Sequence, residues 1–271
     1  EMEDMMNDSN PSGGETTEGA FDECIRHSIT KMSWWHFAAT DQYKKRIIQL
    51  GEHPGRVYNV GGLGVDLIKN LRLLSKKELS SKLGINFLSK NLLITYHPVT
   101  LEKNSSIESM ENLLEVLADL IDVNLIFTMP NADSDGRSIF SLIQSFVLNN
   151  SERAIVFKSM GHLNYLSVMQ FVDGVIGNSS SGIAEAPSLK VGTVNIGDRQ
   201  KGRLKAASVI DCEPNKLSIK NAINILFSKQ FRVDLKSVSS PFGNGNATRK
   251  IFEVLKNNKL PEEIKKEFYN L

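Results

Sequence analysis

The chain has 271 residues with 41% hydrophobic content, which is enough for one large core or two smaller ones. Because 32 basic side chains balance 31 acidic ones, no global field would attract nucleic acid or a membrane surface, and any anion site must be local. Two distant cysteines without a CxxC pattern argue against a zinc site and favour a reducing cytoplasm, and no apolar run is long enough to cross a bilayer.

The first predicted helix carries acidic side chains at its start. It covers residues 20–32, with Asp22 and Glu23 in the opening turn and Arg26 and His27 one turn later. At the spacing i, i+4, Asp22 can pair with Arg26, and Glu23 can pair with His27. Such pairs are common salt bridges on helix surfaces, so the pattern alone does not predict chemistry.

Short elements and a glycine cluster follow this helix. The apolar patterns predict strands at residues 36–40 and 56–60 and helices at 42–50 and 65–71. The sequence GGLG, residues 61–64, lacks the GxGxxG spacing, so we reject a dinucleotide-binding loop. Its glycines permit a sharp change of direction, which suits a domain linker as well as a ligand loop.

From residue 91 onward, strands and helices alternate regularly. The predicted strands cover residues 92–96, 123–127, 154–157, 174–177, 192–196 and 208–211. The predicted helices between them cover residues 105–120, 136–147, 164–171 and 183–189. This alternation predicts an α/β fold with a parallel sheet that helices cover on both faces. Ligands bind beyond the carboxyl ends of such strands, so the residues there are candidates for a site.

The sequence FVDGVIGNSSSGIAE, residues 171–185, is the strongest of these candidates. A buried strand ends there, and residues 178–181 (NSSS) have the side chains of helix N-caps. Unpaired N–H groups at a helix start favour phosphate, Gly182 would let a ligand approach the backbone, and Glu185 could bind a ribose diol. The pattern indicates a nucleotide, although an ordinary serine-capped helix with a surface glutamate explains it about as well.

Polar residues also follow other predicted strands. His97 could donate to a phosphate oxygen, Asn131 could reach a base or sugar, and Arg199, in a basic loop, suits a diphosphate. A lone histidine at a strand end is usually structural, but convergence on one sheet edge favours a site. The converging residues are His97, Asn131, Ser180, Ser181, Glu185 and Arg199. Beyond them, the tail predicts helices at residues 215–228, 247–257 and 261–269 and no chemistry.

With these residues in view, the chain resembles the hydrolysing UDP-N-acetylglucosamine 2-epimerases of the sialic-acid branch, over residues 13–257. The segments that carry the resemblance are GGETTEGAFDECIRHSITKMS, HFAATDQYKKRIIQLGE, VGGLGVD, TYHPVT, IGNSSSGIAEAPSLKVGTVNIGDRQKGR and PFGNGNA. The family fold has two Rossmann-like domains with a nucleotide cleft, as in GT-B glycosyltransferases. The resemblance therefore implies a GT-B-like α/β fold with GGLG as the crossing between domains.

The resemblance also implies domain boundaries. They are an irregular end at residues 1–12, a remnant of the first Rossmann-like domain at 13–61, a UDP-binding domain at 62–245 and C-terminal helices at 246–271 that pack back on the first part. The family's first domain begins about a hundred residues earlier, with a catalytic aspartate that this sequence lacks, and Ser12 stands where the family has His or Glu. We therefore expect a truncated form that binds UDP weakly and turns over nothing.

Roles for single residues follow from the same resemblance. The residues expected to bind UDP are His97, Asn131, Ser180, Ser181, Gly182, Glu185 and Arg199. The residues expected to take part in catalysis are Asp22, Glu23, Arg26 and His97. Family chemistry removes the C2 proton, eliminates UDP and adds water to give N-acetylmannosamine, which requires a carboxylate base, an acid and cations on the diphosphate. Asp22 or Glu23 would be base or acid, without metal or nicotinamide.

The expected partners are a UDP-sugar substrate and other copies of the chain in a homodimer or higher homo-oligomer, with no nucleic acid, no membrane and no cofactor. Cytoplasmic residence is expected. Two alternatives remain open: an epimerase acting on UDP-diacetylbacillosamine, and a catalytically silent UDP-binding module. A GT-B glycosyltransferase is a weaker possibility, because the helix with Asp22, Glu23 and Arg26 belongs to the epimerase pattern.

Overall fold

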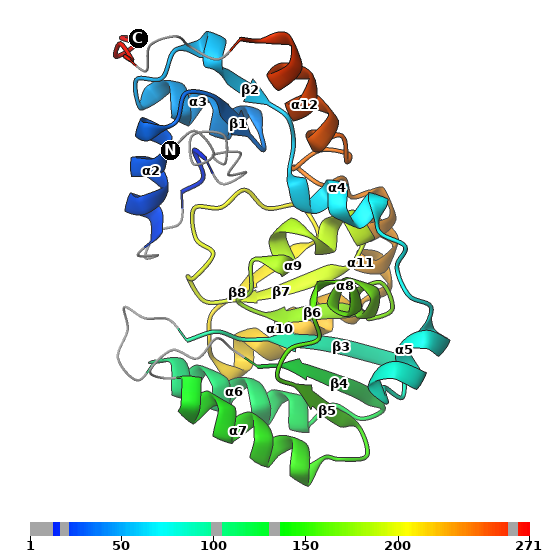
Figure 1. Ribbon diagram of the computed structural model, residues 1–271. Helices are drawn as coiled ribbons and strands as arrows, with labels where there is room; N and C mark the ends of the chain where they lie inside the picture. Colours follow the sequence, from blue (N-terminus) through cyan, green and yellow to red (C-terminus); the bar gives the residue numbers. More distant parts are fainter. Residues whose placement is uncertain (1–12, 17–21, 99–104, 130–135, 260–264) are drawn as a thin grey trace. The chain divides into compact units, whose positions relative to one another are not determined.

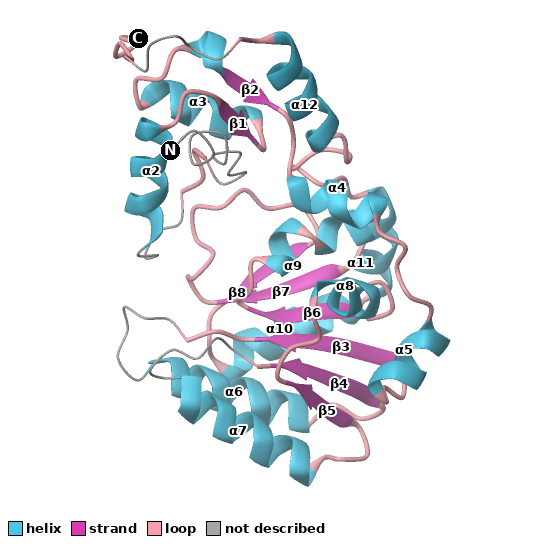
Figure 2. Cartoon of the chain, viewed as in Figure 1, coloured by secondary structure: helices cyan, strands magenta, loops and turns pink. Residues whose placement is uncertain are grey.

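The computed structural model of the chain describes residues 13–16, 22–98, 105–129, 136–259 and 265–271, with backbone alone for Asp22 and Ser105 (Figure 1). The chain forms two compact units. Unit 1 comprises Glu1–Asn70, Lys201–Leu204 and Ser240–Leu271, and unit 2 comprises Leu71–Gln200 and Lys205–Ser239. Each unit contains helices and strands (Figure 2).

Among the described residues, unit 2 has one six-stranded sheet in the order β5-β4-β3-β6-β7-β8, and every strand pair is parallel. The strands are β3 (Lys90–Thr95), β4 (Val123–Thr128), β5 (Ala154–Phe157), β6 (Gly174–Gly177), β7 (Gly192–Ile196) and β8 (Val209–Cys212). The predicted α/β fold class with parallel, Rossmann-like strand pairing is confirmed.

Side chains of successive strand residues enter different cores, because they point to opposite faces of the sheet. Leu92 and Ile94 of β3 pack into a core with residues of α6, α7 and α10, whereas Leu93 packs into a core with α5 and α8. The helical segments of unit 2 are α5 (Lys76–Leu83), α6 (Ser105–Ala118), α7 (Gly136–Asn149), α8 (His162–Met169), α9 (Ser181–Ala184), η2 (Ala186–Leu189), α10 (Lys216–Phe227), α11 (Lys229–Asp234) and η3 (Leu235–Ser237). Both faces of the sheet are therefore covered, as predicted.

Unit 1 contains a small parallel sheet, in which β1 (His36–Ala38) pairs with β2 (Val57–Asn59). Its helical segments are α2 (Asp22–Met32), α3 (Asp41–Gln49), η1 (Pro54–Arg56), α4 (Leu63–Asn70) and α12 (Ala247–Asn257). Trp35 and Phe37 form its core with residues of α12. Asp66 of α4 holds α12, since its carboxylate accepts hydrogen bonds from the N–H groups of Ala247 at 2.8 Å and Thr248 at 2.6 Å.

The structure corrects several predicted elements. Helices α5 and α11 were not predicted, although Ser75 and Glu78 form a capping box at the start of α5. The helix predicted at residues 183–189 is instead two short pieces, α9 and η2, with a proline in the first turn of η2.

The predicted last helix, at residues 261–269, is wrong in its described part. Residues 265–271 have no regular secondary structure, and the Tyr269 N–H donates to the Gly51 carbonyl at 2.9 Å rather than to a carbonyl of a preceding helical turn. The ring of Phe268 packs so closely on Gly51 that a Cβ there would lie 2.3 Å from the ring. Residues 260–264 lie outside the described residues.

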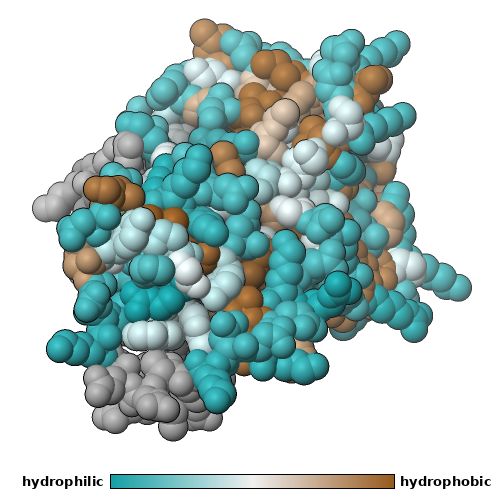
Figure 3. All heavy atoms as spheres, turned by 90° about the horizontal axis from the view of Figure 1, so that it is seen from above, coloured by the Kyte–Doolittle hydropathy of each residue, from teal (hydrophilic) through white to brown (hydrophobic). Residues whose placement is uncertain are grey.

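None of the described helices combines the length and the apolar content that a membrane crossing requires. On the face shown in Figure 3, hydrophobic residues are interspersed with hydrophilic ones.

Candidate functional site

The sheet of unit 2 changes direction between β3 and β6. From β3 the strand order runs outward through β4 to β5, and the chain then returns to β6, on the other side of β3, and continues through β7 to β8 (Figure 1). Open α/β sheets bind ligands outside the carboxyl ends of their strands at such a switch point. His97 follows β3 and Ser179 follows β6, so two of the predicted loops flank this position.

Asn178, which is fully buried, joins the two sides of the switch point. Its Oδ1 accepts a hydrogen bond from the His97 N–H at 2.7 Å, and its Nδ2 donates to the His97 carbonyl at 2.8 Å. Its backbone carbonyl accepts from the guanidinium of Arg199 at 3.1 Å and from Nε2 of Gln200 at 2.7 Å. The structure thus brings the predicted residues His97 and Arg199 together around one buried residue.

A chain of hydroxyl groups lies beside this residue at the ends of β3, β4 and β6. The Tyr165 hydroxyl is 2.7 Å from the Ser181 hydroxyl and 3.3 Å from that of Thr95. Thr95 and Thr128 are joined at 2.6 Å, and Ser179 and Ser181 at 3.0 Å. The hydrogen bond with Tyr165 therefore fixes the hydroxyl of Ser181, one of the predicted site residues.

Burial raises the pKa of Tyr165. Hydrogen bonds with Ser181 and Thr95 act in the opposite direction, and the charge of Glu185 adds to the rise. Because the net direction is upward from about 10, the hydroxyl keeps its proton at neutral pH and donates one of these hydrogen bonds. The network under the strand ends is therefore neutral.

The predicted capping role of the serines is only partly right. Ser180 occupies the N-cap position of α9 but makes no side-chain cap hydrogen bond, whereas the Ser179 hydroxyl accepts from the Ser181 N–H at 3.4 Å. α9 is only 4 residues long, so it has little of the dipole of a longer helix. Anion affinity at this turn would depend on individual N–H, hydroxyl and guanidinium groups.

Gly182 and Glu185 lie on this turn, in different surroundings. A Cβ on Gly182 would lie 2.5 Å from Cγ2 of Thr193, whose hydroxyl donates to the Gly182 carbonyl at 2.7 Å. Packing against β7 thus explains this glycine without a ligand. Glu185 stands half-buried where α9 ends and η2 begins, and its charge acts on Tyr165.

The predicted catalytic residues of the first helix belong to unit 1. Glu23 pairs with His27 at 3.5 Å, as predicted, and Arg26 is buried rather than on the helix surface. For Asp22 the structure describes the backbone alone, as the first residue of α2. Asn131, predicted at the end of β4, lies outside the described residues.

Glu15 of unit 1 is a buried carboxylate that was not predicted to be functional. Glu15 accepts a hydrogen bond from the Tyr43 hydroxyl at 3.3 Å and pairs with the Arg203 guanidinium at 3.3 Å. Burial, followed by the charge of Glu15, raises the pKa of Tyr43 to about 12. Arg203, in the loop expected to bind diphosphate, is thus held by a carboxylate. The segment GGETTEG contains Glu15, but the partners of Glu15 lie far away in the sequence, so sequence spacing did not indicate its role.

Comparison with known proteins gives one family. The family model described as UDP-N-acetylglucosamine 2-epimerase matches residues 12–256. The chain is 44% identical over 260 residues to the GDP/UDP-N,N'-diacetylbacillosamine 2-epimerase (hydrolyzing) of Campylobacter jejuni, and the match covers 96% of the chain and 67% of that protein.

Two further matches agree with this family. The polysialic acid biosynthesis protein P7 of Escherichia coli is 40% identical over 261 residues, with 96% of the chain and 66% of that protein covered. The UDP-GlcNAc 2-epimerase of Neisseria meningitidis, solved bound to UDP-GlcNAc, superposes with a TM-score of 0.76 at 18% identity, covering 92% of the chain and 69% of that structure. The chain therefore spans about two thirds of the length of these relatives.

Proposed function

We propose that this chain, which belongs to the UDP-N-acetylglucosamine 2-epimerase family, binds the UDP moiety of a nucleotide sugar at the switch point of unit 2. The observation that carries the proposal is the double contact of Asn178, which fixes the His97 backbone on one side and receives Arg199 on the other. A histidine and an arginine beside the carboxyl ends of the strands suit the oxygens of a diphosphate.

The remaining predicted residues of unit 2 have roles in the same proposal. Ser180 and Ser181 contribute hydroxyl and N–H groups to the phosphates, and Glu185 accepts hydrogen bonds from the ribose hydroxyls. The half-buried position of Glu185 beside this turn supports its role. Gly182 keeps the turn close to β7, and Asn131 would reach the base or sugar from the end of β4.

The proposed reaction is a hydrolysing 2-epimerisation. A base takes the C2 proton of the sugar, the C–H electron pair forms a C1=C2 double bond, and the C1–O bond breaks with its electrons leaving on UDP. Water then adds across the double bond, with the hydroxyl on C1 and a proton on the opposite face of C2. The products are UDP and the free 2-epimer of the sugar.

The residues of this chain proposed for proton transfer are the carboxylates of α2. Asp22 and Glu23 would act as base and acid, while His97, Arg26 and Arg199 would stabilise the charge that develops on the departing diphosphate. The family match over residues 12–256 supports these roles.

The substrate is proposed to be a UDP-linked N-acetylated hexosamine. UDP-N-acetylglucosamine, giving N-acetylmannosamine for sialic acid or a related acid, is supported by the family description and by the 40% identity to the polysialic acid biosynthesis protein. UDP-diacetylbacillosamine is the second candidate, and the 44% identity to the Campylobacter jejuni enzyme supports it.

Calorimetric titration with UDP and with uridine tests the binding proposal. We expect UDP to bind and Arg199→Gln to weaken UDP by about tenfold while changing uridine affinity little, because one phosphate contact is lost. Arg137→Gln, at an exposed position of α7, is the matched control and should not change either affinity. Absence of UDP binding would overturn the proposal.

Turnover is tested separately, by following UDP release from each candidate substrate with phosphorus NMR. Release from one substrate identifies the sugar and supports the enzymatic role. Binding of UDP without release from either substrate would reject the proposed reaction for this chain and favour a UDP-binding module.

A further inference from the structure

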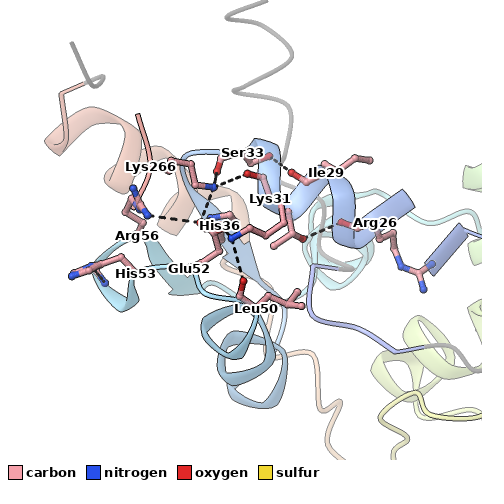
Figure 4. Close-up of polar contacts among 12 residues, drawn as sticks. Arg26, Ile29, Lys31, Ser33, His36, Leu50, Glu52, His53, Arg56 and Lys266 are labelled. Atoms are coloured by element: carbon pink, nitrogen blue, oxygen red, sulfur yellow. Dashed lines mark hydrogen bonds and ion pairs between the residues drawn. The ribbon is translucent and has the colours of Figure 1, made fainter. Parts of the chain in front are cut away.

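A cluster of charged side chains surrounds one buried carboxylate in unit 1, outside the proposed UDP site. The Glu52 carboxylate, which is 0% exposed, lies 2.5 Å from Nζ of Lys31, 2.7 Å from Nζ of Lys266 and 3.0 Å from Nε2 of His36. Figure 4 shows these side chains converging on Glu52 from α2, β1 and the C-terminal tail. Arg56 approaches the same carboxylate, but only to 3.8 Å.

Among the described residues, the charges in this cluster do not balance. Burial alone would raise the pKa of Glu52, but hydrogen bonds from His36, Lys266 and Lys31 outweigh it and lower the pKa to about 2. The carboxylate is therefore ionised at neutral pH and supplies one negative charge. Lys31, Lys266 and Arg56 supply three positive charges, and the first two lie closest to Glu52. The surplus is two positive charges, and Arg56 is the cation that lies farthest from the carboxylate.

Arg56 also has unused hydrogen-bond donors. Its side chain is 15% exposed, and its guanidinium lies over the Trp34 ring at 4.4 Å. Within the described residues its Nε is buried without a hydrogen-bond partner, and the contact with Glu52 is too long for a hydrogen bond. Buried guanidinium donors are nearly always satisfied, so these donors indicate a missing acceptor.

A pocket of about 430 Å³ lies against Arg56. The other described residues that line it are His53, Lys265, Glu267, Phe268 and Tyr269, so the C-terminal tail forms one wall. The Tyr269 N–H is bound to the Gly51 carbonyl, and the Tyr269 ring lies 5.4 Å from the His53 ring, edge to face. The tail thus closes the pocket by contacts within unit 1.

His53 adds a donor to this pocket. Its Nδ1 accepts a hydrogen bond from the Gly55 N–H at 3.1 Å, so the proton of the neutral ring is on Nε2. Lys265 is exposed at the pocket and adds an ammonium group. Glu267 is an exposed carboxylate and offsets Lys265, so the surplus of the cluster around Glu52 remains among the described residues.

We propose that this pocket binds a phosphate group, as inorganic phosphate or as a phosphomonoester, with Arg56, Lys265 and His53 as its donors. The Arg56 guanidinium contacts two oxygens of the anion, and the Lys265 ammonium and the His53 ring contact the others. A dianion fits better than a singly charged carboxylate, because it compensates both surplus positive charges of the cluster, while Glu267 offsets the charge of Lys265. This site is separate from the proposed UDP site, which lies in unit 2.

Tryptophan fluorescence provides a local test. The chain has two tryptophans, Trp34 and Trp35, and Trp34 is in contact with Arg56. Titration of the intact chain with inorganic phosphate and with ribose 5-phosphate should change the emission saturably, whereas acetate and ribose should not. Tighter binding of ribose 5-phosphate would identify an organic phosphomonoester as the occupant, and equal affinities would identify phosphate itself.

Variants connect this signal with the proposed donors. Arg56→Gln should weaken phosphate by about tenfold, and the exposed Lys265→Gln, which should not disturb folding, by a few-fold. Arg72→Gln, at a side chain that is 92% exposed, and Arg199→Gln, in unit 2, should leave the titration unchanged. No saturable change at millimolar phosphate, or a titration that both Arg56→Gln and Lys265→Gln retain, would overturn the proposal.

Discussion

Both units contain buried polar groups, but those of unit 1 are charged and those of unit 2 are neutral. In unit 1 the ionised and fully buried Glu52 is held by the ammonium groups of Lys31 and Lys266, so this cluster is joined by charged groups. In unit 2 the Asn178 amide and the Tyr165 hydroxyl, both neutral, join the strand ends. A charged cluster loses much when one partner is removed, because the other charges stay buried. A neutral network loses less, because removing one hydroxyl or amide leaves no unpaired charge behind.

The largest expected effect comes from Glu52→Gln, which removes the negative charge of the unit 1 cluster. Lys31, Lys266 and Arg56 would then face each other around a neutral amide, and we expect a loss of about 4 kcal/mol in the free energy of unfolding. Denaturant unfolding followed by tryptophan emission measures the loss, since both tryptophans lie in unit 1. Glu111→Gln, on the exposed face of α6, is the control and should change little. A loss below about 1 kcal/mol would mean that the carboxylate does not hold the cluster.

Acid should weaken unit 1 through the same carboxylate. The pKa of Glu52 is about 2 in the folded chain, whereas a glutamate without partners, as in the unfolded chain, has a pKa of 4.5. The folded state therefore binds the proton less tightly. The stabilisation is complete above pH 4.5 and is lost as the pH falls toward 2, by about 3 kcal/mol in total. Stability measured against pH by denaturant unfolding should show this loss, and Glu52→Gln should lack it. An identical acid response in both chains would contradict the prediction.

Asn178→Ala should have a smaller effect on stability and a clear effect on ligand binding. The substitution removes the two hydrogen bonds that the Asn178 side chain makes with the N–H and carbonyl of His97. We expect a loss of about 2 kcal/mol in the free energy of unfolding. UDP affinity should fall because the backbone of His97 is no longer fixed. Asn112→Ala, which removes one hydrogen bond to the Pro214 carbonyl, should reduce stability without changing UDP affinity. Equal UDP affinities in both variants would show that Asn178 has no positioning role.

The sequence predicted the sheet well because its signals are local. The bounds of β5, β6 and β7 were predicted correctly, since short β-branched runs end in glycine or turn residues there. α5 was missed because Leu79 is its only buried residue among those described, which gives little periodicity. The capping box at Ser75 and Glu78 was the available signal for it.

The candidate site was predictable only where position along a strand decides it. His97 and Arg199 follow strands, so the rule for carboxyl ends identified both. The contacts of Asn178 with His97 join residues 81 positions apart, and no sequence spacing reveals them. Glu15 and Glu52 were missed for the same reason, because their cationic partners Arg203 and Lys266 come from distant segments.

Tyr165→Phe tests the neutral network with the smallest change. The variant keeps the ring but removes the hydroxyl between Ser181 and Thr95, and we expect a stability loss of about 1 kcal/mol, because each remaining hydroxyl can turn to another partner. UDP affinity should fall a few-fold, because the Ser181 hydroxyl loses the hydrogen bond with Tyr165 that fixes its orientation. Tyr58→Phe, which removes a hydroxyl that donates to the Gly55 carbonyl in unit 1, is the matched control and should leave UDP affinity unchanged. If Tyr165→Phe lowered stability as much as Glu52→Gln, the distinction between a neutral and a charged cluster would fail, because removal of one neutral hydroxyl leaves no buried charge behind.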